Sequence, residues 1–483
     1  MNRPRPGRGL ELAYEKTIKN LRRLIWLYLI LLIVEGSLRK WVVPQLSNPL
    51  LIIRDPVVIC IYVLALRARV FPRSIFVMSL GIIGILSLVV SIIVLLPYKL
   101  DVKSLLGVTL YGFRSNFLHL PLIFVMANVL NEEDVKQIGK WTLLGMIPMA
   151  ALMVAQFQAP IEAFINKTVG MGENLQIQAG GGKVRPPGPF SFISGPIFYV
   201  SAATAFLIHG ALSRGAYKSW LLVASGFATV IAAAVSGSRG CVASALVVVF
   251  FIVVVMFVRP SAVNRFGWIV LTVAIVALII SRLPVFKEGA DILSERFTTS
   301  AEAGDTTIVG GMLGRTLSEF TDAFEIFDKA PIFGYGLGIG TSGGAKFLIG
   351  QSTFLLTEGE WSRILLENGP ILGLAFLIWR TVLTFWLLYL SLKQLKLGRT
   401  LPIFLFAAGF LGFLTGTLGQ PTSLGFTVVI AGLCLAAIQN PTAPIETPKL
   451  AVTPRRPEIP RRSAYASRLY GPDADHSNGS VDR

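Results

Sequence analysis

Charged side chains and the usual metal ligands are scarce in this chain. Charged residues make up 15% of its 483 positions, and there are three cysteines and three histidines. Cys60, Cys241 and Cys434 all lie inside apolar runs, so we expect them to act as small hydrophobic residues, with neither a disulfide framework nor a zinc site. So little charge excludes an ordinary soluble domain, and nothing in the sequence resembles a metal-ligand cluster.

Apolar residues take the place of charge. Residues of the types AVILMFWYC make up 53% of the chain, and its mean hydropathy is +0.66, which is typical of polytopic membrane proteins. By the rule that about 17–25 apolar residues cross a bilayer core, the sequence predicts about twelve transmembrane spans, near residues 24–38, 50–66, 75–96, 105–129, 138–155, 195–212, 219–236, 241–258, 266–283, 370–391, 401–418 and 422–438.

The predicted fold is an all-α integral membrane protein with a large helical periplasmic loop between spans 9 and 10. Leu317, Phe320, Phe324 and Phe327 recur at a helical spacing in that loop, which indicates an amphipathic helix within a small folded cap. The expected parts are a basic cytoplasmic N-terminus (residues 1–23), spans 1–9 (24–283), the cap loop (284–369), spans 10–12 (370–438) and a disordered basic cytoplasmic tail (439–483). No small-residue cleavage site follows the basic N-terminus, so we expect the first span to be an uncleaved anchor.

The positive charge is unevenly distributed over the predicted loops. The formal net charge is +17, but in a membrane protein the side on which charges lie matters more than their sum. With the N-terminus in the cytoplasm, every short inner loop is basic, as the positive-inside rule expects. An even number of spans then leaves both termini inside, and we expect membrane lipids rather than nucleic acid as a partner of the basic regions.

A second set of cations faces outward or lies in the outer halves of the predicted spans: Arg39, Lys40, Arg54, Arg114, Lys183, Arg185, Arg239, Arg296, Arg315 and Arg363. An arginine near the middle of a transmembrane helix costs about 2.5–3.5 kcal/mol on insertion scales, so it usually faces protein or a wet cavity. Arg114 is the clearest case, because it lies about nine residues into its span, roughly 14 Å deep.

Two interpretations of these cations stay open. In the first they form internal ion pairs: Glu35 and Arg39 have the i, i+4 spacing of a helical pair, whereas the adjacent Arg54 and Asp55 point to different helix faces and cannot pair within one helix. In the second they bind an anionic ligand. For the group as a whole we favour the second, because the outer carboxylates are too few to neutralise every cation.

One motif with such a cation is Val184-Arg-Pro-Pro-Gly-Pro-Phe-Ser191, in the outer loop before the sixth span. Proline stiffens the backbone there, and Gly188 allows the close approach of a ligand. The alternative is an ordinary tight turn.

The other motif is Val235-Ser-Gly-Ser-Arg-Gly240, at the outer junction of the seventh and eighth spans. The eighth span begins there, so its free N–H groups and the positive end of its dipole favour an anion. Ser236, Ser238 and Arg239 add donors. We therefore favour a phosphate site over a simple turn between helices.

Few residues are candidates for acid–base chemistry. His119 lies on an apolar helix and is interpreted as a hydrogen-bonded core histidine rather than a catalyst; His209, near an inner end, and His476, in the tail, are not candidates. Two carboxylates close to an aromatic residue, Glu358 and Glu360, fit a general base with a raised pKa.

The alternative role for Glu358 and Glu360 is structural. Both are close enough in sequence to Arg363 to pair with it, and either could cap the helix that leads into Glu367.

Taken in order, the motifs resemble a known family. Arg185 with its Gly/Pro-Phe turn, then Ser236-Gly-Ser-Arg-Gly240, then Pro331-Ile-Phe-Gly-Tyr-Gly-Leu-Gly338 and Glu367-Asn-Gly369 resemble the O-antigen ligase and O-antigen/exopolysaccharide polymerase superfamily. The motifs cover about residues 180 to 375, and the span layout extends the similarity over residues 24 to 438.

The resemblance implies a glycosyltransferase of the bacterial inner membrane, with its active site facing the periplasm. The donor would be a glycan on undecaprenyl diphosphate and the acceptor a glycan or a lipid-linked glycan, with no metal and no cofactor; polysaccharide export or chain-length regulator proteins are further expected partners. Arg185, Arg239 and Arg315 match positions expected to contact the diphosphate or the sugar. A polymerase is slightly preferred over a ligase.

One position departs from the family pattern. The family often has a histidine nine residues before the glutamate of Glu-Xaa-Gly, and counting back from Glu367 gives Glu358 instead. A histidine-based mechanism is therefore disfavoured here, and the role of base moves to Glu358 or Glu360.

The chemistry gives the same assignment without the family. A diphosphate leaving group needs charge stabilisation more than a proton, and guanidinium groups supply it. The acceptor hydroxyl needs a base. The candidate substrate-binding residues are thus Arg114, Arg185, Ser236, Ser238, Arg239, Arg315 and Arg363, and the candidate catalytic residues are Glu358 and Glu360.

A different class of function is also open. A transporter or lipid flippase would use Arg114, Arg54 and Asp55 as a substrate path, although the sequence shows no repeated halves of the kind that many transporters have. A ligand-sensing membrane protein is a third class, with no sequence feature in its favour.

Overall fold

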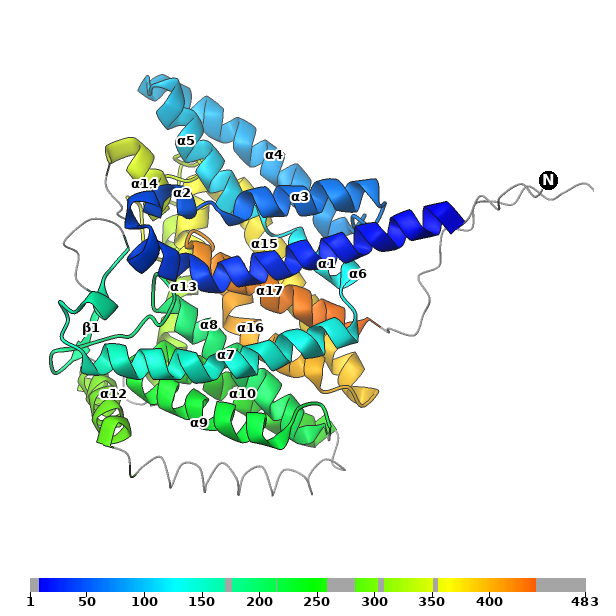
Figure 1. Cartoon of the computed structure of the whole chain (residues 1–483). Helices are drawn as coiled ribbons and strands as arrows, with labels where there is room; N and C mark the ends of the chain where they lie inside the picture. Colours follow the sequence, from blue (N-terminus) through cyan, green and yellow to red (C-terminus); the bar gives the residue numbers. More distant parts are fainter. Residues whose placement is uncertain are drawn as a thin grey trace, which may run out of the picture. The chain divides into compact units, whose positions relative to one another are not determined.

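The computed structural model describes residues 8–169, 176–213, 215–258, 282, 284–302, 308–350 and 355–439. These residues are almost entirely helical, as predicted (Figure 1). The long and medium helices are α1 (Arg8–Ser37), α3 (Arg54–Arg67), α4 (Ile75–Leu95), α5 (Val102–Phe113), α6 (Leu122–Val129), α7 (Glu132–Gln158), α8 (Ser194–Leu212), α9 (Ser219–Val235), α10 (Arg239–Val258), α12 (Pro284–Glu302), α13 (Ile308–Phe327), α15 (Glu360–Lys396), α16 (Leu401–Leu414) and α17 (Pro421–Ile438). The short elements are η1 (Leu38–Val42), η2 (Pro44–Leu46), α2 (Ser47–Leu50), η3 (Leu96–Tyr98), η4 (Arg114–Leu118), η5 (Phe164–Asn166) and α14 (Ser342–Ile349).

Several of these helices are suited to a bilayer. In the described ranges, seven helical segments are long and apolar enough to cross one: Pro44–Arg67, Ile75–Tyr98, Glu132–Gln158, Ser194–Leu212, Arg239–Val258, Glu360–Lys396 and Pro421–Ile438. α9 and α16 are apolar but shorter. The segments are those of a multi-pass membrane protein, the class that the composition predicts. The predicted span at 266–283 lies outside the described residues, as does the predicted disordered tail from residue 440 on, so the count of about twelve spans stays a prediction.

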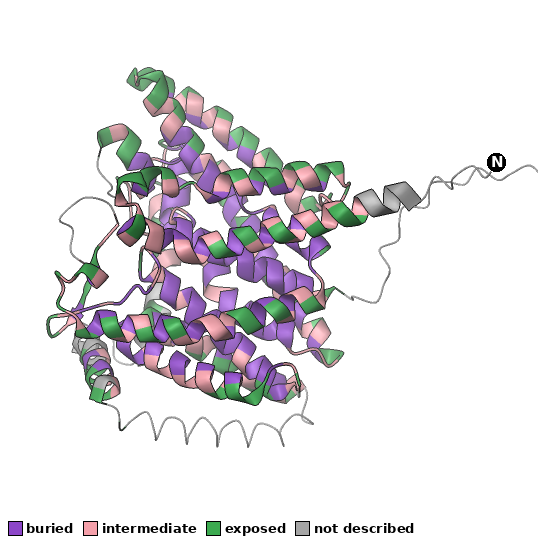
Figure 2. Ribbon diagram, viewed as in Figure 1, coloured by how far each residue is buried: buried purple, intermediate pink, exposed green. Residues whose placement is uncertain are grey.

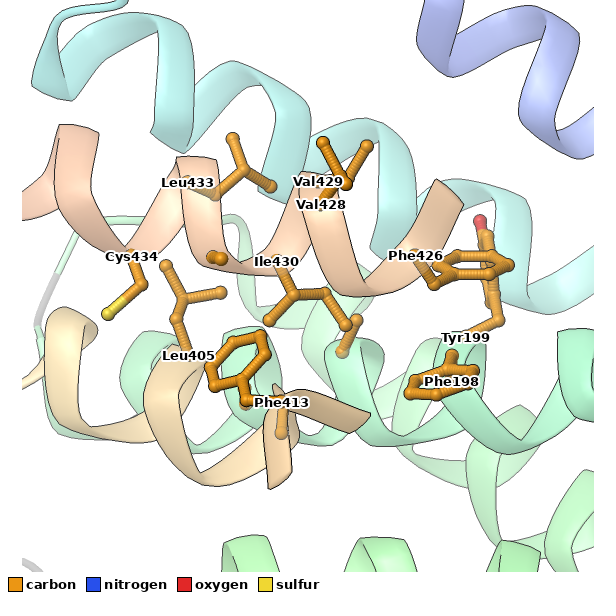
Figure 3. Close-up of a cluster of buried hydrophobic side chains, with 14 of the residues drawn as sticks. Phe198, Tyr199, Leu405, Phe413, Phe426, Val428, Val429, Ile430, Leu433 and Cys434 are labelled. Atoms are coloured by element: carbon orange, nitrogen blue, oxygen red, sulfur yellow. The ribbon is translucent and has the colours of Figure 1, made fainter. Parts of the chain in front are cut away.

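α17 is the most enclosed helix. Its residues from Pro421 to Ala437 are buried, and it packs against α6, α8 and α16 (Figure 2). Phe426 stacks on Phe198 of α8 with ring centroids 5.9 Å apart (Figure 3). Helices at the periphery instead expose apolar side chains, such as Ile82 of α4 at 59%. A helix that is apolar and buried all round forms the core of a bundle, so the other helices are arranged around α17.

The loops predicted to be cytoplasmic meet at one end of the bundle. Arg22 of α1 pairs with Asp134 at the start of α7, at 3.2 Å, and its Nε donates to the carbonyl of Val129. His209 of α8 is 3.0 Å from the hydroxyl of Thr400, which precedes α16. Consecutive helices therefore return to the same end, as an alternating series of spans requires.

A two-stranded antiparallel sheet lies at the opposite end, which we call the hairpin end. β1 (Gln178–Gly180) pairs with β2 (Lys183–Val184), and both link glycines, Gly181 and Gly182, have positive φ angles of 55° and 73°. No strand is predicted here from the sequence. Two to three residues a strand are too few for a periodic signal.

The predicted span 105–129 is not one helix. α5 passes into η4, a π-helical turn, and the chain then bends at His119–Pro121 before α6 begins. Pro121 has no N–H to donate and its ring blocks a continuing helix, while π turns in helices are often found at functional sites. The bend places Arg114 and His119 inside the bundle, both at most 5% exposed.

α15 is also broken. Gly369 has φ 72° and ψ 171°, and Pro370 follows it, so the predicted start of the tenth span at residue 370 coincides with the break. The carbonyls of Leu366 and Glu367, which lose their helical partners at the break, accept hydrogen bonds from the N–H groups of Tyr335 (2.7 Å) and Gly336 (3.1 Å). Residues 360–368, which are predicted to belong to the helical cap loop, form the part of α15 that precedes this break.

The segment before α15 contains the helix expected around Leu317. α13 is helical to Phe327, but its buried face differs from the expected one. Leu317 is 57% and Phe324 is 81% exposed, whereas the ring of Phe320 packs edge-on against Trp361 with centroids 4.5 Å apart. α13 therefore docks on the start of α15 through Phe320.

Candidate functional site

The two arginine motifs come together at the hairpin end. Gly237, between α9 and α10, has φ 54°, and a Cβ placed on it would lie 2.6 Å from the Cβ of Ala179 in β1 and 3.7 Å from the Cγ of Arg185. Only glycine allows this approach, because its φ is in the left-handed region and its missing side chain makes room for β1. Gly237 is thus a neighbour of two residues that lie 58 and 52 positions before it in the sequence.

Arg185 is held against the hairpin by its own backbone and side chain. Its N–H donates to the carbonyl of Ile177 at 2.8 Å, and its Nε donates to the carbonyl of Gln178 at 3.1 Å. The side chain is half-buried. The guanidinium is therefore positioned by short local contacts while part of it faces outward.

The junction before α10 has the features of a capped helix start. The carbonyl of Ser238 accepts the N–H of Cys241 at 3.0 Å, the N–H of Ser238 donates to the Oγ of Ser236 at 3.2 Å, and Arg239 is the first residue of α10. Both serines are buried and Arg239 is half-buried. The start of α10, which carries Arg239, thus follows directly on Gly237, the residue that lies against Arg185, and the positive end of a helix dipole favours an anion.

α12 packs over the same hairpin. Lys183 of β2 forms an ion pair with Glu288 of α12 at 3.0 Å, and Ile292 of α12 is only 8% exposed where it lies over Gly180. We call Lys183, Arg185, Ser236, Ser238 and Arg239 the basic junction. Arg315 lies on α13 and Arg296 on α12, but their side chains are outside the described part of the chain.

Gly188 is surrounded by protein atoms. Its carbonyl accepts the Nζ of Lys40 at 2.7 Å, and its N–H donates to the side chain of Gln156 at 2.8 Å. The N–H of Phe190 donates to the carbonyl of Pro187, which closes a tight turn. At this residue the structure shows the ordinary turn, which was the alternative to close ligand approach.

The other predicted site residues belong to buried ion networks. Glu35 lies between two arginines, 3.1 Å from Nη1 of Arg39 and 3.2 Å from Nε of Arg54. The i, i+4 pair of Glu35 and Arg39 is thereby confirmed. Arg54 is fully buried, and its Nη2 also donates to the carbonyl of Pro421 at 2.6 Å.

A hydrogen-bonded chain continues from Arg54. Its Nη1 is 3.4 Å from the hydroxyl of Tyr28, which is 3.0 Å from Nδ1 of His119; Nε2 of His119 is 2.9 Å from Asp55. If the Tyr28 oxygen accepts from Arg54, its proton is donated to Nδ1, so a neutral His119 carries its proton on Nε2 and donates it to Asp55. His119 is therefore a hydrogen-bonded core residue, as predicted.

Arg114 ends this chain. Its Nε is 2.5 Å from Asp55 and its Nη2 donates to the carbonyl of Leu51 at 3.0 Å, while its Nη1 is buried without a hydrogen-bond partner among the described residues. Asp55 is thus paired with Arg114, two predicted spans further along the chain, and not with the adjacent Arg54, as the helix geometry predicts.

Arg363 is the centre of another network. It lies 2.9 Å from Glu360 and 2.6 Å from Glu367, and its Nη2 donates to Oδ1 of Asn116 at 3.0 Å. Glu360 also accepts the N–H of Leu418 at 3.0 Å. Asn116 belongs to η4, the π turn that carries Arg114, so this turn links the two networks.

The two candidate bases differ in their surroundings. Glu360 is 1% exposed and its carboxylate is engaged by Arg363 and Arg380, whereas Glu358 is exposed in the loop before α15. For Glu360 the structure shows the ion pair that was the alternative to a catalytic role. Glu358 is the carboxylate of the two that is open to a ligand.

Glu319 is a residue near this loop that sequence reasoning missed. Its Oε2 accepts the N–H groups of Glu360 at 3.0 Å and Trp361 at 3.4 Å, so it caps the start of α15 from α13. Burial raises the pKa of the Glu319 carboxyl. A single glutamate on an amphipathic helix carries no sequence signal for such a contact, because its partner is about forty residues away in the chain.

Comparison with known proteins adds no assignment. No protein family matches the sequence, and no curated protein is significantly similar to it. In the described part of the chain, no three or more His, Cys, Asp or Glu side chains are grouped so as to hold a metal ion. The site is therefore interpreted from its own residues.

Proposed function

We propose that the protein is a membrane glycosyltransferase that polymerises or ligates glycan repeat units carried on undecaprenyl diphosphate, at the periplasmic face of a bacterial inner membrane. The observation that carries the proposal is the contact of Gly237 with Ala179 and Arg185. This contact joins two motifs whose residues suit a phosphate ligand, and whose order along the chain resembles that of O-antigen ligases and polymerases.

The charge of the basic junction suits a diphosphate. Lys183, Arg185 and Arg239 come from two separate loops, and the start of α10 adds the partial positive charge of a helix dipole. A guanidinium binds phosphate oxygens in a bidentate manner. As the glycosyl bond breaks, the diphosphate leaves with the bonding electrons, and preorganised cations stabilise the charge that develops.

The acceptor needs a base for its hydroxyl group. In the proposed step the acceptor oxygen attacks the anomeric carbon, the bond from that carbon to the diphosphate breaks, and the hydroxyl proton moves to Glu358. Glu358 is exposed before α15, and the neighbouring Glu360 is already paired. We therefore assign the base to Glu358 and a structural role to Glu360.

The location rests on the two ends of the bundle. The hairpin end holds the basic junction, and the opposite end gathers Arg22, Asp134 and the loops that the positive-inside rule assigns to the cytoplasm. The junction then faces the periplasm, where lipid-linked glycans would be presented.

The test is transfer by the purified protein. We expect the reconstituted chain to extend or transfer an undecaprenyl-diphosphate repeat unit, and Arg185→Ala or Arg239→Ala to reduce the rate about 10²-fold, the typical effect of removing one charge-stabilising donor. Arg67→Ala, at the exposed last residue of α3, is the matched control. Absence of transfer with several acceptors overturns the proposal.

Polymerase and ligase are separated in cells by glycan length. In a deletion strain, loss of long chains with a single repeat unit left on the acceptor indicates a polymerase. Accumulation of unattached long chains indicates a ligase.

Transport of a lipid or polar substrate is the second candidate, favoured by one observation. The chain from Arg54 through Tyr28, His119 and Asp55 to Arg114 is buried within the bundle, and ionisable groups inside membrane proteins often mark substrate or proton paths. The test is a transport assay with the Arg114→Ala variant. If this substitution abolishes substrate flux and leaves glycan length in the producing cell unchanged, the result supports transport over glycan transfer.

A further inference from the structure

A large apolar groove lies between α1 and α7. Its cavity volume is about 760 Å³, within the range of about 300–1,000 Å³ usual for ligand pockets. α1 and α7 form its two sides, while α8 and α17 form its floor. In Figure 1, α17 is seen between these two helices, and Figure 3 shows Tyr199, Phe426 and Leu433 of the floor.

Two hydroxyl groups in the wall are already hydrogen-bonded within the protein. The hydroxyl of Tyr199 donates to the carbonyl of Thr142 at 3.0 Å, and the hydroxyl of Thr142 donates to the carbonyl of Ile138 at 2.9 Å. A cavity must offer polar partners to hold ordered water. This groove offers almost only hydrocarbon and aromatic surface, so its natural occupant is an apolar chain.

The groove follows the direction of the membrane-crossing helices. The wall on α7 runs from Gln137 to Leu152, a rise of about 22 Å at 1.5 Å per residue. That covers most of a hydrocarbon core of about 30 Å. Trp141 and Ile30 on the two rims are 54% and 51% exposed, so the groove opens sideways on the surface of the bundle, where a lipid chain enters.

One end of the groove leads to the basic junction. Pro189 lines it, and one turn beyond Leu152 the side chain of Gln156 holds Gly188. Lys183 lies over the ring of Phe157, 5.2 Å from its centroid. Pro189 is four positions from Arg185 in the sequence, a reach of at most about 15 Å.

We propose that this groove binds the isoprenoid chain of the lipid-diphosphate donor, with the diphosphate at the basic junction. The inference rests on the proposed function for the choice of lipid: two arginines near the start of α10 suit the charge of a diphosphate better than the single phosphate of a bilayer phospholipid, whereas Lys183 is already paired with Glu288. The groove holds the chain beside the bundle while the head group is fixed at the hairpin end.

The experiment uses photo-crosslinking in place of turnover. The full chain is placed in nanodiscs of phosphatidylethanolamine and phosphatidylglycerol with a polyprenyl diphosphate that carries a diazirine on its chain, and a diazirine-bearing phosphatidylglycerol is run in parallel. We expect the polyprenyl probe to label the α7 peptide from Gln137 to Leu152. Excess unlabelled polyprenyl diphosphate competes, and excess phosphatidylglycerol does not.

Bulky substitutions test the position of the chain. Thr142→Trp on α7 and Ile33→Trp on α1 fill the groove from opposite walls, and each reduces labelling at least fivefold. Ile82→Trp adds the same bulk at an exposed position of α4 and leaves labelling unchanged. The elution volume of each variant in size-exclusion chromatography shows that it is folded, and either groove variant alone suffices for the test.

The outcomes separate this inference from the proposed function. The isoprenoid site is overturned, even when glycan transfer occurs, by either of two results. One is labelling that is spread evenly over the bundle; the other is labelling and competition by phosphatidylglycerol that equal those of the polyprenyl lipid. Specific labelling of the groove without any transfer leaves the lipid site standing and overturns only the glycosyltransferase. Where both hold, Thr142→Trp raises the KM for the donor and leaves kcat nearly unchanged.

Discussion

Two sets of arginines in this protein have opposite surroundings. Arg54 and Arg363 are at most 3% exposed and bound by carboxylates and backbone carbonyls. Arg185 and Arg239 are half-buried at the hairpin end, on backbone that is rich in glycine and serine. The first set is enclosed by protein on all sides, whereas the second has a face toward solvent or ligand.

The comparison shows why counting charges is a poor guide to a ligand site. A buried ion pair satisfies its members internally, and it is costly mainly when one partner is removed. A half-buried arginine beside a helix start has part of its side chain open to solvent, where an anion can reach it. The same residue type therefore has a structural role in the core and is a candidate for binding at the hairpin end.

The largest expected effect is in the buried set. Arg363→Met leaves Glu360 and Glu367 without their shared cation, and removing one member of such a network costs about 3–5 kcal/mol. We expect a large fall in the thermal unfolding temperature in detergent, with loss of folded protein. Arg67→Met, at an exposed site, leaves the unfolding temperature unchanged. An Arg363→Met protein of normal stability contradicts the structural role.

The next effect separates the two glutamates. Glu358→Gln removes the proposed base from an exposed loop, so we expect the transfer rate to fall about 10²-fold or more with an unchanged unfolding temperature. Glu360→Gln removes a buried charge that balances Arg363 and Arg380, so stability falls and the rate per folded molecule is retained. If Glu360→Gln lowers the transfer rate at unchanged stability and Glu358→Gln lowers stability at an unchanged rate, the base is Glu360.

A smaller effect tests the joining of the two motifs. Gly237→Ala places a side chain at a positive φ and against Ala179, which costs about 1–3 kcal/mol. We expect a moderate loss of stability and roughly a tenfold loss of transfer, because Arg185 and Arg239 are displaced from each other. Gly226→Ala on α9 is the matched control, since a Cβ there meets no atom within 4 Å.

The smallest effect is a pH dependence at the edge of the buried set. Burial lowers the pKa of Lys40 from 10.5 to about 7, so between these values the unfolded chain keeps a proton that the folded chain has released. Stability therefore rises with pH across this window and is lowest below it. Lys40→Met removes this slope. Unfolding temperatures measured between pH 6 and 10 check it, and an unchanged slope in the variant contradicts the assignment.

The sequence predicted the class of fold and several local features well. Long apolar runs located most of the helices, the predicted start of the tenth span at residue 370 coincides with the break in α15, and the spacing of Glu35 and Arg39 indicated their ion pair. These features depend on residues within a few positions of one another. They are determined by helix geometry over a few residues and by the burial of apolar segments away from water.

The partners across the bundle could not be predicted in this way. Asp55 pairs with Arg114, Glu319 caps α15, and Gly237 receives Ala179. Each contact joins residues at least 41 positions apart in the chain, and many other partners of suitable charge or size were available. The sequence alone offers no reason to choose among them.

What the sequence by itself determined is that this chain is a helical membrane protein with more cations than a bilayer easily accepts. Only the tertiary structure decided which cations are neutralised inside the bundle and which gather at the hairpin end. The physical reason is that hydrophobicity acts on each segment separately, whereas the neutralisation of a buried charge depends on which distant group the packing of helices brings within about 4 Å.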